Sequence, residues 1–321
     1  MSKITAARKS THLTSTELKT RQRVPLRYIS NNASRQPIAR RQQPTINIKE
    51  PIKPFHHLEL EIGDPTDPQD IVEYENIIYR TMRQQELAAK KHIFRQTEIT
   101  LKDRNLLIDA MCRFHFKLGS TTNTFYRFIG ILDRYLSVVN VPKRRLHLVG
   151  CAALFIASKI EDIKPALADD LIQLSSYSFT ANELFSYEVK IINAIGFDTT
   201  FPTPLFFLTH FMRINGQTKT TFLYSRYILE ICQTSEAFFN VKGSLMACLT
   251  VMFCRILEGK TKWSPELAGY TQYSEEELLP YAEKVIAILQ EEDRPETAFM
   301  RRKYGSNIFL YVAHLDIPSL K

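Results

Sequence analysis

The 321-residue sequence lacks the compact motifs that usually carry catalysis or metal binding. Its eight histidines are scattered, and none is paired with another histidine and a glutamate at the spacing of a helical zinc site. Only ten glycines are present, and no glycine-rich phosphate loop follows a strand. His115 and His147 are more typical of packed or surface positions than of catalytic bases. We therefore expect no enzymatic activity, no metal and no cofactor.

The sequence also lacks paired cysteines and long apolar runs. Its five cysteines are odd in number, show no C-x-x-C spacing and fall inside apolar helical segments. Buried thiols in a reducing compartment fit this pattern best. No run of about eighteen apolar residues and no signal-peptide core is present, so we expect neither export nor membrane insertion.

Positive charge is concentrated at one end of the chain. The net charge is +8, yet residues 1–55 contain twelve Lys and Arg against only Glu17 and Glu50. The remainder is slightly acidic, which does not suggest a nucleic-acid footprint on the folded part. Residues 1–60 are rich in Arg, Thr, Ser, Gln, Asn and Pro and cannot bury enough apolar surface to offset the entropy of ordering. We therefore expect a disordered basic tail there.

An apolar helical stretch at residues 146–160 organises the rest of the chain. A helix that is apolar on every side is enclosed by protein or lipid, and this stretch is too short to span a membrane comfortably. Lys159 adds a charge to its last turn before Pro165 ends the helix. Because long helical patterns dominate and few segments alternate with the period of a strand, the fold class is predicted to be all-α.

Three helical patterns recur later in the sequence. Residues 124–136 (TFYRFIGILDRYL) and 148–162 (LVGCAALFIASKIED) both reappear at an offset of 97, and a third pattern reappears at an offset of 94. Repeats this long indicate domain duplication. We predict two similar five-helix bundles in tandem, at residues 101–198 and 199–321. A further helix and linker at residues 61–100 precede them, with Asp67 as N-cap and Pro68 at the first helical position.

The duplicated layout and several charged residues resemble the cyclin family, and within it the mitotic, B-type cyclins. The resemblance runs from about Asp67 to Ser306. Residues 263–280 and 302–306 also look like B-type sequence. Five charged residues mark the first box of the family, and this sequence has matching types at Arg104, Asp109, Asp133, Lys159 and Glu188. The fold that this resemblance implies is a tandem pair of five-helix cyclin-box bundles.

The resemblance implies a regulatory, non-enzymatic subunit that binds and activates a cyclin-dependent kinase to drive the G2/M transition. Lys159 and Glu188 would then project onto the kinase, ringed by Ile160, Glu161 and Ile192. An ion pair internal to the bundle is the alternative for these two charges. Activation would arise by population shift, because the cyclin binds the active arrangement of the kinase more tightly.

Other charged positions are predicted to be structural. Arg104 and Asp133 lie amid apolar neighbours on the first two helices of the first bundle, so we expect a buried ion pair between them, and we expect Asp109 to be structural too. In relatives the first helix also carries an apolar patch that docks substrates. The matching positions here are Asp103, Leu106, Leu107 and Ala110. The lost apolar area weakens the expectation of substrate docking by this route.

The basic tail contains a motif that resembles a degradation signal. Arg23, Leu26 and Asn31 match R-x-x-L-x-x-x-x-N, the pattern of the destruction box that the anaphase-promoting ubiquitin ligase reads. Lysines nearby are possible ubiquitin acceptors. We therefore expect removal by ubiquitin-dependent proteolysis, and we expect the protein in both nucleus and cytoplasm.

Two other classes of function are left open. A transcription factor with tandem cyclin folds would bind promoter DNA, but that class needs an N-terminal zinc ribbon and a basic second repeat, and no cysteine pair precedes Cys112. An α-helical enzyme, or a scaffold without a kinase partner, would need a concave polar site, for which the sequence supplies no cluster. The expected partners are a cyclin-dependent kinase and the ubiquitin ligase, with neither nucleic acid nor a membrane.

Overall fold

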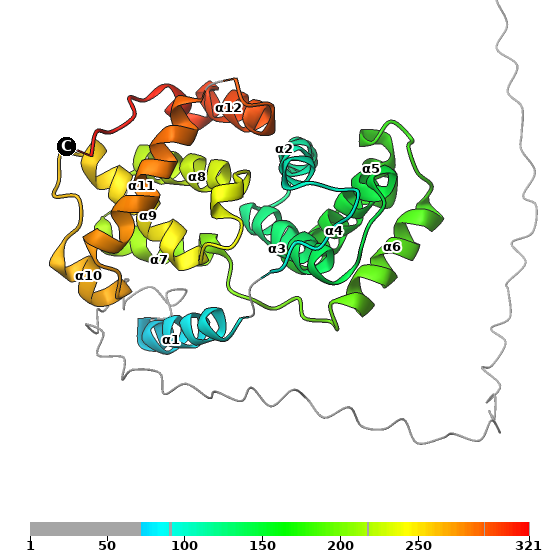
Figure 1. Cartoon of the computed structure of the whole chain (residues 1–321), viewed down its shortest axis with the longest axis horizontal. Helices are drawn as coiled ribbons and strands as arrows, with labels where there is room; N and C mark the ends of the chain where they lie inside the picture. The colour runs from blue at the N-terminus through cyan, green and yellow to red at the C-terminus, as the bar shows by residue number, and fades with distance from the viewer. Residues whose placement is uncertain (1–71, 90–91, 217, 292, 321) are drawn as a thin grey trace, which may run out of the picture. The chain divides into compact units, whose positions relative to one another are not determined.

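A computed structural model of the chain describes residues 72–89, 92–216, 218–291 and 293–320 (Figure 1). The predicted basic tail and the motif at Arg23, Leu26 and Asn31 lie outside the described residues, as does the predicted start of the N-terminal helix at Asp67. Throughout the described ranges the regular structure is helical and no strand occurs. The predicted all-α class is confirmed.

The first bundle consists of five α-helices. They are α2 (Leu101–Leu118), α3 (Thr122–Val138), α4 (Leu146–Glu161), α5 (Ala168–Leu174) and α6 (Ala181–Ala194), with a short 3-10 turn η1 (Lys143–Arg145) before α4. Every residue from 148 to 158 is buried, and α4 packs against α2, α3 and α6. A side chain at Gly150 would meet Leu107 of α2 at 2.8 Å, so this glycine permits the close approach of the two helices. The apolar stretch is thus the central helix, as the sequence predicts.

The second bundle repeats this plan. It consists of α7 (Pro204–Asn215), α8 (Lys219–Gln233), α9 (Gly243–Leu257), α10 (Pro265–Thr271) and α11 (Glu275–Gln290). Its central helix is α9, which is buried throughout residues 246–254 and packs against α7, α8 and α11. The predicted pair of five-helix bundles is confirmed.

Similar caps begin equivalent helices. Thr180 and Glu183 form a capping box at the start of α6, and Ser274 and Glu277 form one at the start of α11. In each box the hydroxyl accepts a backbone N–H and the carboxylate accepts another, which satisfies donors that the first helical turn leaves unpaired. The same local chemistry therefore starts the last helix of both bundles.

The helix that precedes the bundles, α1 (Val72–Ala88), packs on the second bundle. Tyr79 is fully buried and stacks on His210 and Tyr270, with ring centroids 4.9 and 4.8 Å away. Arg83 Nη1 donates to Ser244 Oγ of α9 at 2.6 Å. The buried face of α1 thus packs within its own chain, while Tyr74 and Ile77 remain exposed.

The C-terminal region contributes a last short helix, α12 (Ala298–Tyr304), preceded by the 3-10 turn η3 (Pro295–Thr297) and followed by η4 (Asn307–Phe309) and η5 (Val312–His314). A further 3-10 turn, η2 (Glu236–Phe238), precedes α9. Helix α12 packs against α2 of the first bundle and α8 of the second (Figure 1). It therefore joins two helices that lie more than a hundred residues apart in the sequence.

Candidate partner-binding surface

Lys159 and Glu188 lie side by side on the first bundle. Lys159 lies in the last turn of α4, Glu188 lies in the middle of α6, and Lys159 Nζ donates to Glu188 Oε1 at 2.6 Å. The side chains are 40% and 22% exposed, so the pair lies at the surface. The ammonium also lies 3.9 Å from the ring centroid of Phe155. Lys159 and Glu188 therefore form an ion pair within the first bundle, and both side chains are also exposed at its surface.

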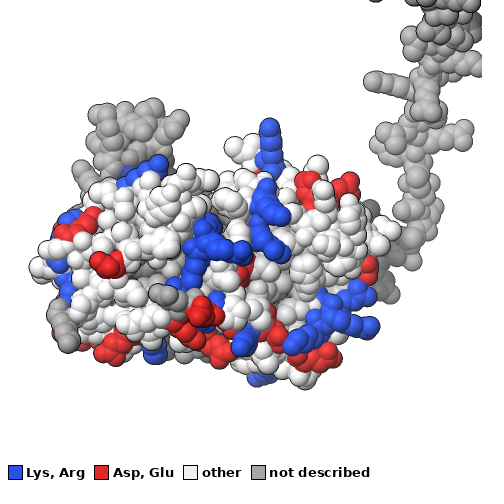
Figure 2. Space-filling view, turned by 90° about the horizontal axis from the view of Figure 1, so that it is seen from above, with Lys and Arg blue, Asp and Glu red and all other residues white. Residues whose placement is uncertain are grey.

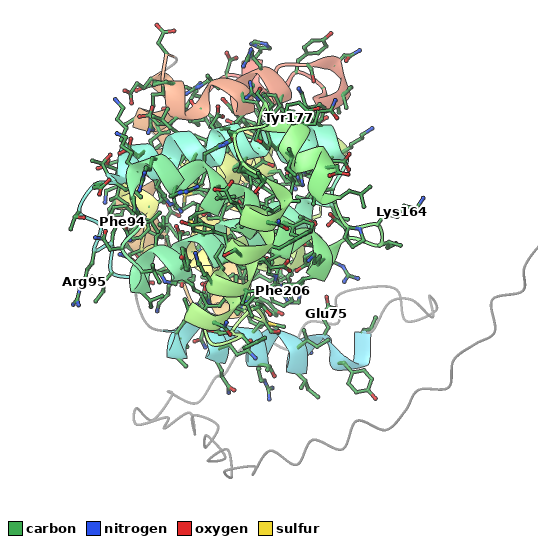
Figure 3. The ribbon with its side chains drawn as sticks, turned by 90° about the vertical axis from the view of Figure 1, so that its right-hand side faces the viewer. Glu75, Phe94, Arg95, Lys164, Tyr177 and Phe206 are labelled. Atoms are coloured by element: carbon green, nitrogen blue, oxygen red, sulfur yellow. The ribbon has the colours of Figure 1, made fainter. Side chains whose placement is uncertain are left out.

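Exposed apolar side chains occur on the elements that carry this pair. They come from the end of α4, the loop to α5, and α6, and include Ile160, Ile163, Leu167, Phe185 and Val189. Ile163 is 98% exposed. Apolar side chains gathered at the surface around polar groups are typical of a protein-binding site. Figure 3 shows this side of the molecule, with Lys164 projecting from the loop between α4 and α5.

Two of the predicted ring residues have contacts within the chain. The Glu161 carboxylate pairs with Arg127 Nε at 2.6 Å, and the same arginine donates to the backbone oxygens of Thr199 and Phe201. Glu161 therefore fastens the linker between the bundles. Ile192 is partly buried against the core.

Four of the exposed apolar residues were not predicted from the sequence: Ile163, Leu167, Phe185 and Val189. Their spacing could have indicated the exposed side of α6. Phe185 and Val189 are four residues apart and so share one face of the helix, whereas its buried residues are Leu184 and Ile191.

Arg104 and Asp133 form a buried bidentate ion pair between α2 and α3. Arg104 Nε and Nη2 donate to the two carboxylate oxygens of Asp133 at 2.9 and 2.6 Å. Arg104 Nη1 also donates to the backbone oxygen of Gln233 at the end of α8. The arginine therefore holds two helices of the first bundle together and reaches the second bundle as well.

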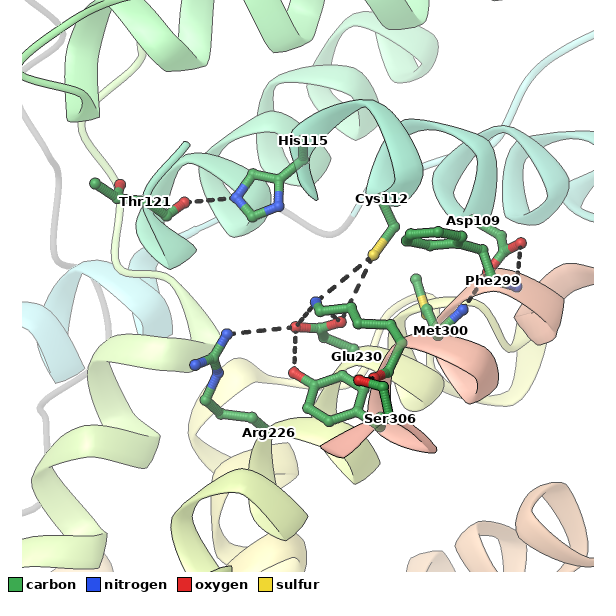
Figure 4. Close-up of polar contacts among 11 residues, drawn as sticks. Asp109, Cys112, His115, Thr121, Arg226, Glu230, Phe299, Met300 and Ser306 are labelled. Atoms are coloured by element: carbon green, nitrogen blue, oxygen red, sulfur yellow. Dashed lines mark hydrogen bonds and ion pairs between the residues drawn. The ribbon is translucent and has the colours of Figure 1, made fainter. Parts of the chain in front are cut away.

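Asp109 does not join this ion pair. Its carboxylate accepts the backbone N–H groups of Phe299 and Met300, at 2.9 and 3.0 Å, in the first turn of α12 (Figure 4). Burial raises the pKa of Asp109, and these N–H donors act in the opposite direction. Asp109 is therefore structural, but its carboxylate binds the backbone of α12 and not a cationic side chain.

The four positions that match the docking patch of relatives do not form a continuous apolar surface. Asp103 closes a capping box with Thr100 and pairs with Lys143 Nζ at 2.8 Å. Leu107 is buried and Ala110 is half-buried, which leaves Leu106 as the exposed apolar side chain among the four. The loss of apolar area that the sequence suggests is thus visible in the structure.

A cavity of about 410 Å³ with both apolar and polar walls lies between α1, α3 and α7. Its walls include Glu75, Arg213 and His210, and Arg213 Nη1 donates to Glu75 Oε1 at 2.9 Å. His210 lies 3.3 Å from the same carboxylate and hydrogen-bonds to the Tyr270 hydroxyl. These contacts hold α1 against α7, and no pattern in the sequence predicts them.

Across the described part of the chain, no group of three or more His, Cys, Asp or Glu is placed to hold a metal ion. The same residues contain no helix long and apolar enough to cross a membrane.

The two tandem five-helix bundles define an all-helical protein of duplicated architecture, with exposed apolar side chains near an ion pair on the first bundle. The family profile "Cyclin, N-terminal domain" matches residues 76–200, and "Cyclin, C-terminal domain" matches residues 202–318. The chain belongs to the cyclin family.

Its relatives include B-type cyclins. It is 26% identical over 265 residues to G2/mitotic-specific cyclin-B of Patella vulgata, covering 82% of this chain and 64% of the relative. It is 29% identical over 263 residues to G2/mitotic-specific cyclin-B of Dictyostelium discoideum, covering 80% and 60%. The chain thus spans less than two thirds of the length of these relatives.

Two solved structures share the fold. A viral cyclin from herpesvirus saimiri superposes with a TM-score of 0.59 at 21% identity, over 70% of this chain and 98% of that one. A chain of the yeast RNA polymerase II CTD kinase CTDK-1 complex superposes with a TM-score of 0.52 at 10% identity, over 67% and 73%.

Proposed function

We propose that this chain is a regulatory subunit that binds a cyclin-dependent kinase and activates it for the G2/M transition. The observation that carries the proposal is the exposed Lys159–Glu188 pair on a surface that also presents Ile160, Ile163 and Val189. Membership of the cyclin family supports a regulatory role, since cyclins are regulatory subunits and not enzymes. The similarity to cyclins named for G2 and mitosis supports the stage of the cell cycle.

The surface suits a helix of the kinase. Apolar side chains from α4, the following loop and α6 supply area that a partner helix can cover, and covering it removes apolar surface from water. Such an interface in a signalling complex buries on the order of 2,000 Å² or more in total. Activation follows if this contact is stronger to the active arrangement of the kinase than to the inactive one.

The charged pair adds specificity more than affinity. An exposed ion pair contributes roughly 0–1 kcal/mol. Once a partner covers it, the remaining N–H groups of Lys159 and the free oxygen of Glu188 lose water and need partners of their own. A kinase that supplies an acceptor and a donor there is favoured over one that does not.

Activation of a purified mitotic cyclin-dependent kinase by the full chain tests the proposal. We expect Lys159→Ala with Glu188→Ala to reduce substrate phosphorylation at least about tenfold at limiting concentrations of this chain, because truncating a covered charge pair leaves buried partner groups unpaired. Val189→Asp should reduce it further, since a charge replaces an apolar contact.

The matched control removes another exposed glutamate and lysine, which lie on the second bundle. Glu283→Ala with Lys284→Ala lies on α11, and both residues are exposed. These variants should activate like the unchanged chain, with equal helicity by circular dichroism. A well-folded chain that neither binds nor activates any cyclin-dependent kinase contradicts the proposal.

We further propose that the tail motif at Arg23, Leu26 and Asn31 directs removal by the anaphase-promoting ubiquitin ligase. The support is the motif itself and its place in a basic segment ahead of the cyclin domains. In a mitotic extract, Arg23→Ala with Leu26→Ala should lengthen the lifetime of the chain, whereas Arg40→Ala with Arg41→Ala should not. Equal lifetimes of the first variant and the unchanged chain would exclude the motif. The distribution between nucleus and cytoplasm stays a prediction.

A further inference from the structure

Two exposed arginines lie on α2 and α12, the helices that pack together where the C-terminal region docks. Arg113 of α2 and Arg302 of α12 are both exposed, and within the described ranges neither has an ion-pair partner. Both lie within about one helical turn of the contact at Asp109: Arg113 follows Asp109 by four residues on α2, and Arg302 follows Phe299, whose N–H donates to that carboxylate, by three residues on α12. That carboxyl is already occupied by the backbone of α12. Arg302 Nε donates to the backbone oxygen of Ala298 at 3.3 Å, and the other N–H groups of the two guanidinium groups are available to a ligand.

A third cation and exposed apolar side chains complete this surface. Lys117 is exposed and lies one helical turn beyond Arg113 on the same side of α2. Phe116 is exposed between them in sequence, with its ring centroid 6.1 Å from that of Phe299, and Arg302 lies 6.0 Å from the Phe299 ring. We call this surface the α2–α12 seam and define it by Arg113, Phe116, Lys117, Arg302 and the exposed Ile308.

The charge around the seam is of one sign. Figure 2 looks onto the face that carries α2 and α12, and it shows Lys and Arg side chains gathered across the middle of that face with few Asp or Glu among them. Two acidic groups close to the seam, Asp109 and Glu296, are buried: Asp109 contacts the α12 backbone, and Glu296 lies 3.8 Å from Lys102. A ligand at the seam must therefore carry negative charge.

The tail of the same chain does not fit this surface. Residues 1–55 carry twelve Lys and Arg against two Glu, so the seam repels them. A nucleic acid fits less well than a peptide, because residues 56–321 carry a net negative charge and a long polyanion would meet acidic surface beyond the three cations. The occupant is a separate protein segment with local negative charge and an apolar residue beside it.

We propose that the α2–α12 seam binds a phosphorylated serine or threonine of a partner protein, with Arg113 and Arg302 on the phosphate and Phe116 and Ile308 against a neighbouring apolar side chain. A phosphate suits two planar guanidinium groups better than a carboxylate does, since it offers three acceptor oxygens and a charge near −2. Lys117 adds a point charge at the edge.

The proposal extends the proposed function. If the chain activates a kinase, the seam retains partners that a previous phosphorylation has marked, so that they are presented again for further phosphorylation. The seam is built from α2 and α12 and shares no residue with the surface on α4 and α6. Binding at the seam can therefore be measured without the kinase.

Fluorescence anisotropy with the full chain tests the seam. The probe is a fluorescein-labelled peptide with one phosphoserine next to a leucine, compared with its unphosphorylated form and a form with glutamate in that position. We expect the phosphorylated peptide to bind about tenfold or more tightly than either of the others at physiological salt. Arg113→Ala with Arg302→Ala should remove this preference.

Two further variants separate the causes. Arg95→Ala removes an exposed arginine elsewhere, labelled in Figure 3, and should leave binding unchanged. Arg113→Lys with Arg302→Lys keeps the charge but removes the two-pronged donors, and should lose most of the preference for phosphate. Thermal unfolding checks that each variant folds like the unchanged chain.

Several outcomes overturn the proposal. Equal binding of the phosphorylated and unphosphorylated peptides does so, as does unchanged binding in the Arg113→Ala, Arg302→Ala variant. Tighter Arg-dependent binding of a single-stranded oligonucleotide would assign the seam to nucleic acid instead. Kinase activation is measured separately with a short unphosphorylated substrate. If the chain binds the phosphopeptide through these arginines but activates no kinase, the proposed function is refuted and the proposal for the seam stands.

Discussion

The buried pair of Glu230 and Lys303 offers the sharpest test of how the two bundles are joined. Lys303 Nζ of α12 donates to both carboxylate oxygens of Glu230 on α8, at 2.9 and 2.8 Å, and the Tyr304 hydroxyl donates at 2.6 Å (Figure 4). The two charged side chains are only 2% and 1% exposed. Burial acts to raise the pKa of Glu230, but Lys303 and Arg226 outweigh it, so the pKa is lowered and the carboxylate is charged. We consider Lys303→Met as the perturbation.

The structure sets the magnitude of the effect. Removing one partner of a buried ion pair leaves the other charge uncompensated and typically costs about 3–5 kcal/mol. Arg226 lies 3.9 Å from Glu230 and the Tyr304 hydroxyl still donates, so we expect the lower end, about 3 kcal/mol. For a domain of this size that corresponds to a fall of roughly 6–12 °C in the melting temperature. Glu230→Leu should cost a similar amount, because it leaves Lys303 buried without its carboxylate.

Thermal unfolding of the two single variants and the double variant decides the matter. Replacing both charges with apolar residues removes the uncompensated charge, so Glu230→Leu with Lys303→Met should be much more stable than the sum of the single effects predicts. Lys284→Met, at an exposed position on α11, is the control and should change little. Additive losses in the double variant would show that the pair acts through packing and not through charge, and would refute the reasoning.

Two further predictions concern packing and pH. Gly130→Ala places a methyl group against the ring of Phe201, which the guanidinium groups of Arg127 and Arg134 also contact. We expect it to lower the free energy of unfolding by about 1–3 kcal/mol, measured by thermal unfolding. Phe201→Leu in the same background should recover part of this loss, and an unchanged stability of Gly130→Ala would contradict the close contact. Burial lowers the pKa of His115, so the unfolded chain takes up this proton at a higher pH than the folded chain does. The free energy of unfolding should therefore fall as the pH drops from about 7.5 to about 5.5. It should fall less in the His115→Gln variant. An equal fall in the variant and the unchanged chain would show that other groups cause the pH dependence.

Much of the fold follows from patterns that act within a few turns of helix. The apolar stretch at residues 146–160 predicts a buried central helix because no side of it suits water, and α4 is that helix. The repeated patterns predict a second bundle because helices with similar apolar positions bury corresponding faces. Arg104 and Asp133 could be paired in advance, because each is a charge amid apolar residues on helices expected to be neighbours.

The tertiary structure alone decided where several charged groups point. Glu161 was expected to lie beside Lys159 toward a partner, and the structure shows that its carboxylate pairs with Arg127 of α3, which also donates to the backbone of the linker. Which of two adjacent residues faces outward depends on how the chain passes over the helix end, and periodicity does not encode that path.

The sequence by itself determined the all-α class and the duplication, because both depend on helical periodicity, whereas a shared site of Lys159 and Glu188 was expected only from residue types that match the cyclin family. Only the tertiary structure decided that Asp109 holds a helix 190 residues away, and that Arg113 and Arg302 lie within about one helical turn of that contact. The physical reason is that α12 is a short helix whose position is set by docking on α2 and α8 and not by a pattern of its own. Contacts between elements so distant in the chain exist only once both bundles have packed.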